Sequence, residues 1–158
     1  MDEKRKLISN LIRIIDDMHS HGIYHRDLNP DSILITDDGK IKLVNFDFAK
    51  LEGNPTVRDG LLGKFNEYRS YELFFRVINK IDYHTDYYSL GVIIYEILTG
   101  ETPVKNVRDL GQNIPVDVGE CGDSLGGRQR LNEALKAILS RDLDIRAKGY
   151  ALLKKIFA

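Results

Sequence analysis

Cysteine is nearly absent from this chain, and neither sign of charge predominates. Cys121 is the one cysteine in 158 residues, so the chain can form no internal disulfide and no cysteine-based zinc site. The 23 basic residues nearly cancel the 24 acidic ones, so no overall charge attracts the protein to nucleic acid or to an anionic membrane. We therefore predict no nucleic-acid partner and no membrane partner.

Long hydrophobic runs are also missing. The most apolar stretch, Leu90 to Leu98, contains Glu96 and is much shorter than the ~20 residues that a membrane-spanning helix needs. We therefore predict a cytoplasmic protein. The length and the 42% hydrophobic content are typical of one folded domain that covers residues 1–158.

Most of the predicted secondary structure is helical. Apolar side chains recur at helical spacing over residues 3–20, and Gly22 marks the end of this helix. Two short strands, 33–35 and 41–44, flank an Asp-Gly turn that is typical of a β-hairpin. Further helices are predicted around residues 86–98, 131–139 and 147–157. Residues 45–70 and 105–127 show no steady periodicity, and an irregular stretch as long as the first is typical of a functional loop.

The most informative run reads Tyr-His-Arg-Asp-Leu-Asn-Pro-Asp-Ser over residues 24–32. It resembles the catalytic loop of protein kinases, H-R-D-L-x-x-x-N, and Leu28 and Pro30 flank Asn29 in the manner of Ser/Thr kinases. Further landmarks resemble Asp-Phe-Gly, Ala-Pro-Glu, the start of the family's central helix and a motif near its end. They are Asn45-Phe46-Asp47, Ser70-Tyr71-Glu72, Asp86 to Gly91 and Asp142 to Arg146, in the family's order.

This resemblance implies a mostly α fold, namely a protein-kinase-like C-terminal lobe that is helical with a small β-hairpin. Kinases hold ATP with a Gly-rich loop and a strand lysine in an N-terminal lobe. Neither motif precedes the catalytic loop in these 158 residues, so we expect the N-lobe to be absent. We also expect no cofactor on this chain alone, and Mg-ATP only if an N-lobe completes the site.

The resemblance places Asp27 at the position of the catalytic base. The metal-binding positions are weaker, because Asn45 replaces an aspartate and Ser32 replaces an asparagine, whereas magnesium prefers anionic oxygens. Asn29 replaces a lysine that would neutralise the transferring phosphate, and Phe65 takes the place of a substrate-facing threonine. These departures predict impaired phosphotransfer.

Three other positions complete the implied site. Asp47 either supplies the missing metal charge from a shifted loop or is a solvated acid. Arg26 either receives a phosphate on Thr56, the one Ser or Thr between residues 45 and 70, or forms local hydrogen bonds. Leu34 falls at the position that forms the floor of the adenine site.

The remaining landmarks are expected to be structural. By resemblance, Glu72 and Arg146 form a buried ion pair, and Asp86 holds the backbone of the catalytic loop. His25 is expected to pack as a structural residue, and no metal site is expected because the other histidines form no clear ligand set with it. Of those, the pair at the end of the first helix is expected to be solvated: His19 and His21.

Three functional hypotheses follow from this sequence. In the first, the chain is a pseudokinase fragment that acts by protein–protein interaction. A protein partner, a separately encoded N-lobe or a second copy then covers the apolar face that carries Ile33, Leu34 and Ile35. In the second, an N-lobe completes a Ser/Thr protein kinase that uses Asp27 as its base. In the third, the chain is the product of a decayed gene with no selected role.

Overall fold

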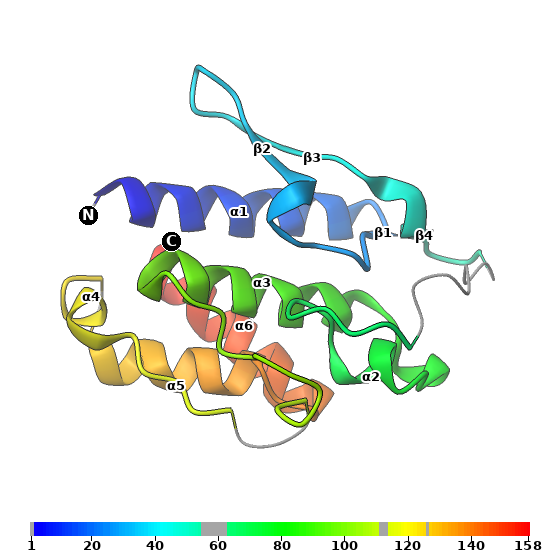
Figure 1. Cartoon of the computed structure of the whole chain (residues 1–158). Helices are drawn as coiled ribbons and strands as arrows, with labels where there is room; N and C mark the ends of the chain where they lie inside the picture. The colour runs from blue at the N-terminus through cyan, green and yellow to red at the C-terminus, as the bar shows by residue number, and fades with distance from the viewer. Residues whose placement is uncertain (1, 55–62, 111–113, 126) are drawn as a thin grey trace.

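Long helices form the body of the computed structural model, which describes residues 2–54, 63–110, 114–125 and 127–158. They are α1 (Asp2–Ser20), α3 (Tyr83–Thr99), α5 (Arg128–Ile138) and α6 (Leu143–Phe157). Helix α3 contacts the other three. Figure 1 shows α1 on one side of α3 and α5 on the other. The predicted mostly helical fold is confirmed.

Helix α3 is central, and most of its residues between Thr85 and Leu98 are buried. Its N-cap is Asp82, whose carboxylate accepts a hydrogen bond from the His84 amide at 2.8 Å. Its C-cap is Gly100 in the left-handed conformation. A Cβ on Gly91 would lie 2.5 Å from Ile138 Cγ2, so a glycine at this position allows α3 and α5 to pack closely.

Helix α6 begins earlier than the sequence pattern predicted. The expected start was residue 147, but Asp142 caps the helix by accepting hydrogen bonds from the amides of Asp144 and Ile145, both at 3.0 Å. The first turn was missed because its residues were interpreted only as a motif. The segment 105–127 likewise contains a short helix that was not predicted, α4 (Gly119–Asp123).

Two small antiparallel sheets of two strands each flank the loops that follow α1. The predicted hairpin is present as β2 (Ile33–Ile35) and β3 (Ile41–Leu43), and it projects over α1 in Figure 1. The second sheet was not predicted and joins β1 (Ile23–Tyr24) to β4 (Lys50–Leu51). It therefore closes residues 25–49 into one loop region whose ends are paired.

Short helical turns complete the described structure. They are η1 (Pro30–Ser32), η2 (Phe46–Phe48), α2 (Tyr71–Phe74) and η4 (Ile78–Lys80). None of the helices described is both long and apolar enough to cross a membrane.

Candidate functional site

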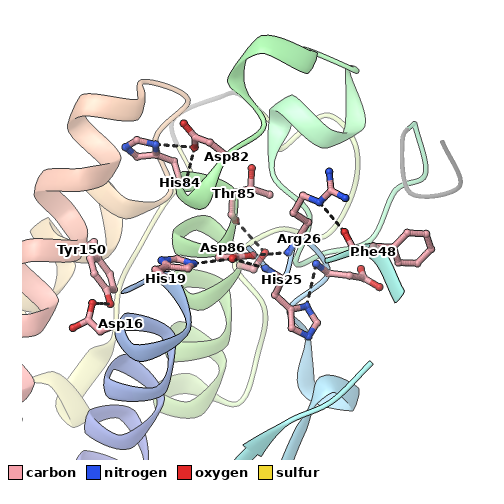
Figure 2. A network of polar contacts seen from close by, with 12 residues as sticks. Asp16, His19, His25, Arg26, Phe48, Asp82, His84, Thr85, Asp86 and Tyr150 are labelled. Carbon is pink, nitrogen blue, oxygen red and sulfur yellow. Dashed lines mark hydrogen bonds and ion pairs between the residues drawn. The ribbon is translucent and has the colours of Figure 1, made fainter. Parts of the chain in front are cut away.

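Asp86 in the first turn of α3 holds the loop that follows β1. Its carboxylate is fully buried and accepts the amide of His25 at 2.9 Å and the amide of Arg26 at 2.7 Å (Figure 2). A third hydrogen bond of 2.8 Å comes from His19 Nε2 at the end of α1. One buried carboxylate therefore fixes the start of the loop relative to two helices, which is the structural role expected for Asp86.

His25 and Arg26 connect this loop to the segment around η2. The His25 ring is fully buried, and its Nε2 lies 2.9 Å from the carbonyl oxygen of Val44. Arg26 has a positive φ of 65° and donates from Nε to the carbonyl oxygen of Phe48 at 2.7 Å. Burial lowers the pKa of the Arg26 guanidinium, and the charge of Asp86 opposes that shift. The phosphate hypothesis for Arg26 depends on Thr56, which lies outside the described residues.

Asp27 lies next in the loop, and its carboxylate forms an ion pair with Arg69. The distance from Arg69 Nη2 to Asp27 Oδ1 is 3.0 Å, and the side chains are 13% and 19% exposed, respectively. Arg69 was not among the site residues predicted from the sequence. No local pattern connects residues that are 42 positions apart, so only the fold identifies the pair.

Asn29 and Ser32 direct their polar atoms into the loop itself. Asn29 Nδ2 donates to the carbonyl oxygen of Asp27 at 2.9 Å, and Asn29 Oδ1 accepts the amide of Asp31 at 2.9 Å. The fully buried Ser32 hydroxyl donates to the Asn29 carbonyl oxygen at 2.8 Å and accepts the Asn29 amide at 3.1 Å. These bonds form a capping box around η1.

Asn45 also hydrogen-bonds to the backbone of this loop. It has a left-handed backbone with φ of 63°, and its side-chain Nδ2 donates to the carbonyl oxygen of Asp31 at 3.1 Å. Asp47 lies in η2 and is exposed. No group of three or more His, Cys, Asp or Glu side chains in the described structure is placed to hold a metal ion.

These contacts bear on the magnesium that the family resemblance implies. Mg²⁺ is usually bound by carboxylates together with water and substrate phosphates. Ser32 and Asn45 offer neutral groups that already hydrogen-bond to the loop backbone. Asn45 therefore lacks the anionic oxygen that magnesium prefers, and the single neutral oxygen of Ser32 is already hydrogen-bonded within the loop.

Apolar side chains of β2 are exposed on the hairpin or line a groove beside it. Leu34 is 50% exposed and Ile35 is 61% exposed. A groove of about 270 Å³ lies between α1, β2 and α3. It is lined by Leu7, Leu11, Pro30, Ile33, Ile35, Ile93, Glu96 and Ile97.

The ion pair expected between Glu72 and Arg146 is present beneath the loop. Arg146 Nη1 lies 2.5 Å from Glu72 Oε1, and both side chains are buried. Thr85 donates its hydroxyl to the same Glu72 oxygen at 3.1 Å. Phe65, at the expected substrate-facing position, instead packs edge-on against the Phe74 ring at a centroid distance of 6.4 Å.

The prediction that His19 is solvated was wrong. Its side chain is 10% exposed and contacts Asp86, and its ring packs against Tyr24, Tyr83 and Tyr87. His19 lies four residues after the buried Ile15, so helical spacing could have placed it on the inner face of α1. His21 is exposed, as predicted.

Comparisons with known proteins identify protein kinases as relatives of this chain. A family model for the protein kinase domain matches residues 1–144. A putative serine/threonine-protein kinase of Acanthamoeba polyphaga mimivirus is 40% identical over 98 residues, which is 58% of this chain and 34% of that protein. Serine/threonine-protein kinase 1 of Heliothis zea nuclear polyhedrosis virus is 30% identical over 116 residues, which is 73% of this chain and 41% of that protein.

A bacterial serine/threonine-protein kinase is also similar to this chain. The probable serine/threonine-protein kinase PknB of Lactococcus lactis is 36% identical over 104 residues, which is 65% of this chain and 16% of that protein. The chain therefore spans less than half the length of these curated relatives. Because the family model matches most of the chain and the kinase loop residues are anchored to α3 by Asp86, this chain belongs to the protein kinase family.

Proposed function

We propose that this chain is a kinase C-lobe segment with impaired phosphotransfer, which acts by binding another protein. The observation that carries the proposal is the arrangement of Ser32 and Asn45. Both side chains are neutral, and both hydrogen-bond to backbone carbonyl groups of the loop.

The single cysteine, Cys121, is compatible with a reducing compartment, and we propose a cytoplasmic location.

The energetic argument concerns the charge on the transferring phosphate. In this family, catalysis consists mainly of positioning and of neutralising phosphate charge with metal ions. A metal ion contributes several kcal/mol to the stabilisation of that charge, so weak metal binding is expected to slow transfer by at least about 100-fold. We therefore expect no tight Mg-ATP binding by this chain alone.

The proposed binding surface comprises both sides of β2. Leu34 is exposed on one side, and Ile33 and Ile35 on the other side line the groove together with Leu7 and Leu11. Large exposed apolar patches on soluble proteins often mark interaction sites. The half-exposed Leu34 protrudes on one side of the strand, and the depression beside Ile33 and Ile35 lies on the other. A protein partner is the occupant that we propose.

The experiment that tests impaired transfer uses a chimera of this chain with the N-lobe of an active Ser/Thr kinase. Radiolabelled ATP and a generic acceptor protein are added to the chimera and to its Asp27→Ala variant. We expect equal background labelling from both, and a gain of transfer in the Ser32→Asn, Asn45→Asp double variant. Transfer by the unmodified chimera that disappears in Asp27→Ala would contradict the proposal.

The interaction is tested by sizing with light scattering and by binding of a hydrophobic dye. We expect the unmodified chain to bind the dye or to associate, and Leu34→Glu to reduce either signal while helical content stays unchanged. Arg130→Glu, at an exposed position on α5, serves as the control. A monomeric chain that binds no dye and does not respond to Leu34→Glu would remove the support for this surface.

A second candidate function is supported by the retained Asp27. In this alternative, the chain is part of a Ser/Thr kinase that transfers the γ-phosphate of ATP when an N-lobe completes it, with Asp27 as the base. The names of the relatives and the fraction of their length that the chain spans favour it. The chimera experiment separates the two candidates.

A further inference from the structure

Arg69 connects the catalytic loop to the segment that leads into α2. Its Nη2 donates to Asp27 Oδ1 at 3.0 Å, and its Nη1 donates to the carbonyl oxygen of Lys64 at 3.1 Å. The side chain is 13% exposed. Its Nε is buried and has no hydrogen-bond partner among the described residues. The guanidinium is therefore a largely desolvated cation that faces the Asp27 carboxylate.

The loop leaves the Asp27 carboxylate available for this contact. Asn29, two residues later, turns its amide toward the Asp27 backbone carbonyl instead of toward the carboxylate. The Asp27 side chain is 19% exposed. A pair that is shielded from water to this degree is screened less than a surface ion pair. Removing one partner leaves a partly buried charge without compensation.

The other side of the Arg69 segment is attached to α3. Ser89 donates its hydroxyl to the carbonyl oxygen of Tyr68 at 2.7 Å, and the Tyr68 hydroxyl donates to Glu96 Oε2 at 2.8 Å. Residues 64–70 are thus held between α3 and the catalytic loop. The contact with the catalytic loop passes through Arg69.

We infer that Arg69 occupies the Asp27 carboxylate, which would otherwise orient an acceptor hydroxyl. We call this ion pair the Arg69 clasp. Asp27 then serves as the counter-ion that holds residues 64–70 against the loop. This inference rests on the proposed function and extends it. The positions of Ser32 and Asn45 weaken the nucleotide side of the site, whereas Arg69 closes its acceptor side.

The clasp is tested by amide hydrogen exchange in residues 64–70 of the full chain. Asp27→Asn preserves side-chain shape and removes one charge, and Arg69→Gln removes one charge and shortens the side chain while keeping it polar. We expect each variant to speed exchange in this segment about tenfold or more. We expect the double variant to speed exchange no more than the single ones, because the same contact is lost and no uncompensated charge remains. Lys105→Gln, in the exposed pair with Glu101, is the control and is expected to leave the segment unchanged.

One further variant and a comparison of the two single variants can disprove the inference. Arg69→Lys retains the charge but not the fork that reaches both Asp27 and Lys64, so it is expected to restore part of the protection. If Arg69→Gln speeds exchange and Asp27→Asn does not, Arg69 acts through the Lys64 carbonyl and the inference is wrong. The proposed function would stand in that case.

The phosphotransfer assay also distinguishes the Arg69 inference from the proposed function. In the chimera described above, Arg69→Gln is expected to remain inactive because the metal positions are unchanged. Transfer gained by Arg69→Gln alone would support the clasp, and it would contradict the proposal that Ser32 and Asn45 prevent catalysis.

Discussion

Arg146 and Glu72 form a fully buried ion pair with two parallel contacts, although they are 74 residues apart in the sequence. Nη1 lies 2.5 Å from Oε1, and Nη2 lies 3.2 Å from Oε2. Arg146 also donates to the carbonyl oxygens of Ser140 and His84. The pair thereby attaches α2 to the start of α3 and to the start of α6.

Removal of the Arg146 charge is expected to destabilise the whole domain. Arg146→Met leaves the buried Glu72 carboxylate without a cationic partner, which costs about 3–5 kcal/mol of unfolding free energy. Lys148→Met, at an exposed position two residues later in α6, is expected to change the unfolding free energy by less than about 0.5 kcal/mol. Urea denaturation of both variants measures the difference. Equal, small shifts would show that the pair does not stabilise the fold.

Asp86 is expected to be intolerant even of an isosteric change. Asp86→Asn places an amide donor among groups that themselves donate, namely the amides of His25 and Arg26 and the His19 ring. At least one hydrogen bond is lost inside the protein, at a cost of about 1–3 kcal/mol. Chemical denaturation and hydrogen exchange at His25 and Arg26 measure this cost. The exposed Asp31→Asn is the control, and the same stability in both variants would contradict the prediction.

Gly149 is expected to be required for the packing of α6 on α5. A Cβ at this position would lie 2.3 Å from the backbone nitrogen of Ile138 and 2.7 Å from the carbonyl carbon of Ala137. Because these are backbone atoms, Gly149→Ala must shift one helix, at a cost of about 1–3 kcal/mol. Lys148→Ala is the neighbouring control. Thermal unfolding followed by circular dichroism gives the comparison, and a gain in stability for Gly149→Ala would disprove the close approach.

Tyr150 is expected to make stability fall at alkaline pH. Burial and a 2.6 Å hydrogen bond to Asp16 raise the pKa of its phenol above the ordinary value. A raised pKa in the folded state stabilises the protein below the unfolded pKa of about 10, and this contribution is lost as the pH rises through the folded value. Denaturation midpoints compared at about pH 8 and about pH 11 measure the loss. We expect Tyr150→Phe to lose less stability over this interval, and an equal loss in both proteins would contradict the role of Tyr150.

Much of the helical framework was predictable because it depends on local patterns. The apolar spacing of α1, the Asp-Gly turn between β2 and β3, and the apolar run of α3 each reflect interactions between residues close in sequence. The kinase-like order of the motifs also indicated the Glu72–Arg146 pair. Boundaries were less accurate where a cap such as Asp142 decided them.

The contacts that define the site were decided by the tertiary structure. The sequence placed Asp27 in a loop, but the packing of residues 64–70 on α3 brought Arg69 to it. The sequence likewise marked Asn45 as a neutral substitute, while its left-handed backbone and its bond to the Asp31 carbonyl followed from the fold. Periodicity and motifs report local preference and family membership. Ion pairs across 42 residues depend on how helices and loops pack, and no local pattern encodes that packing.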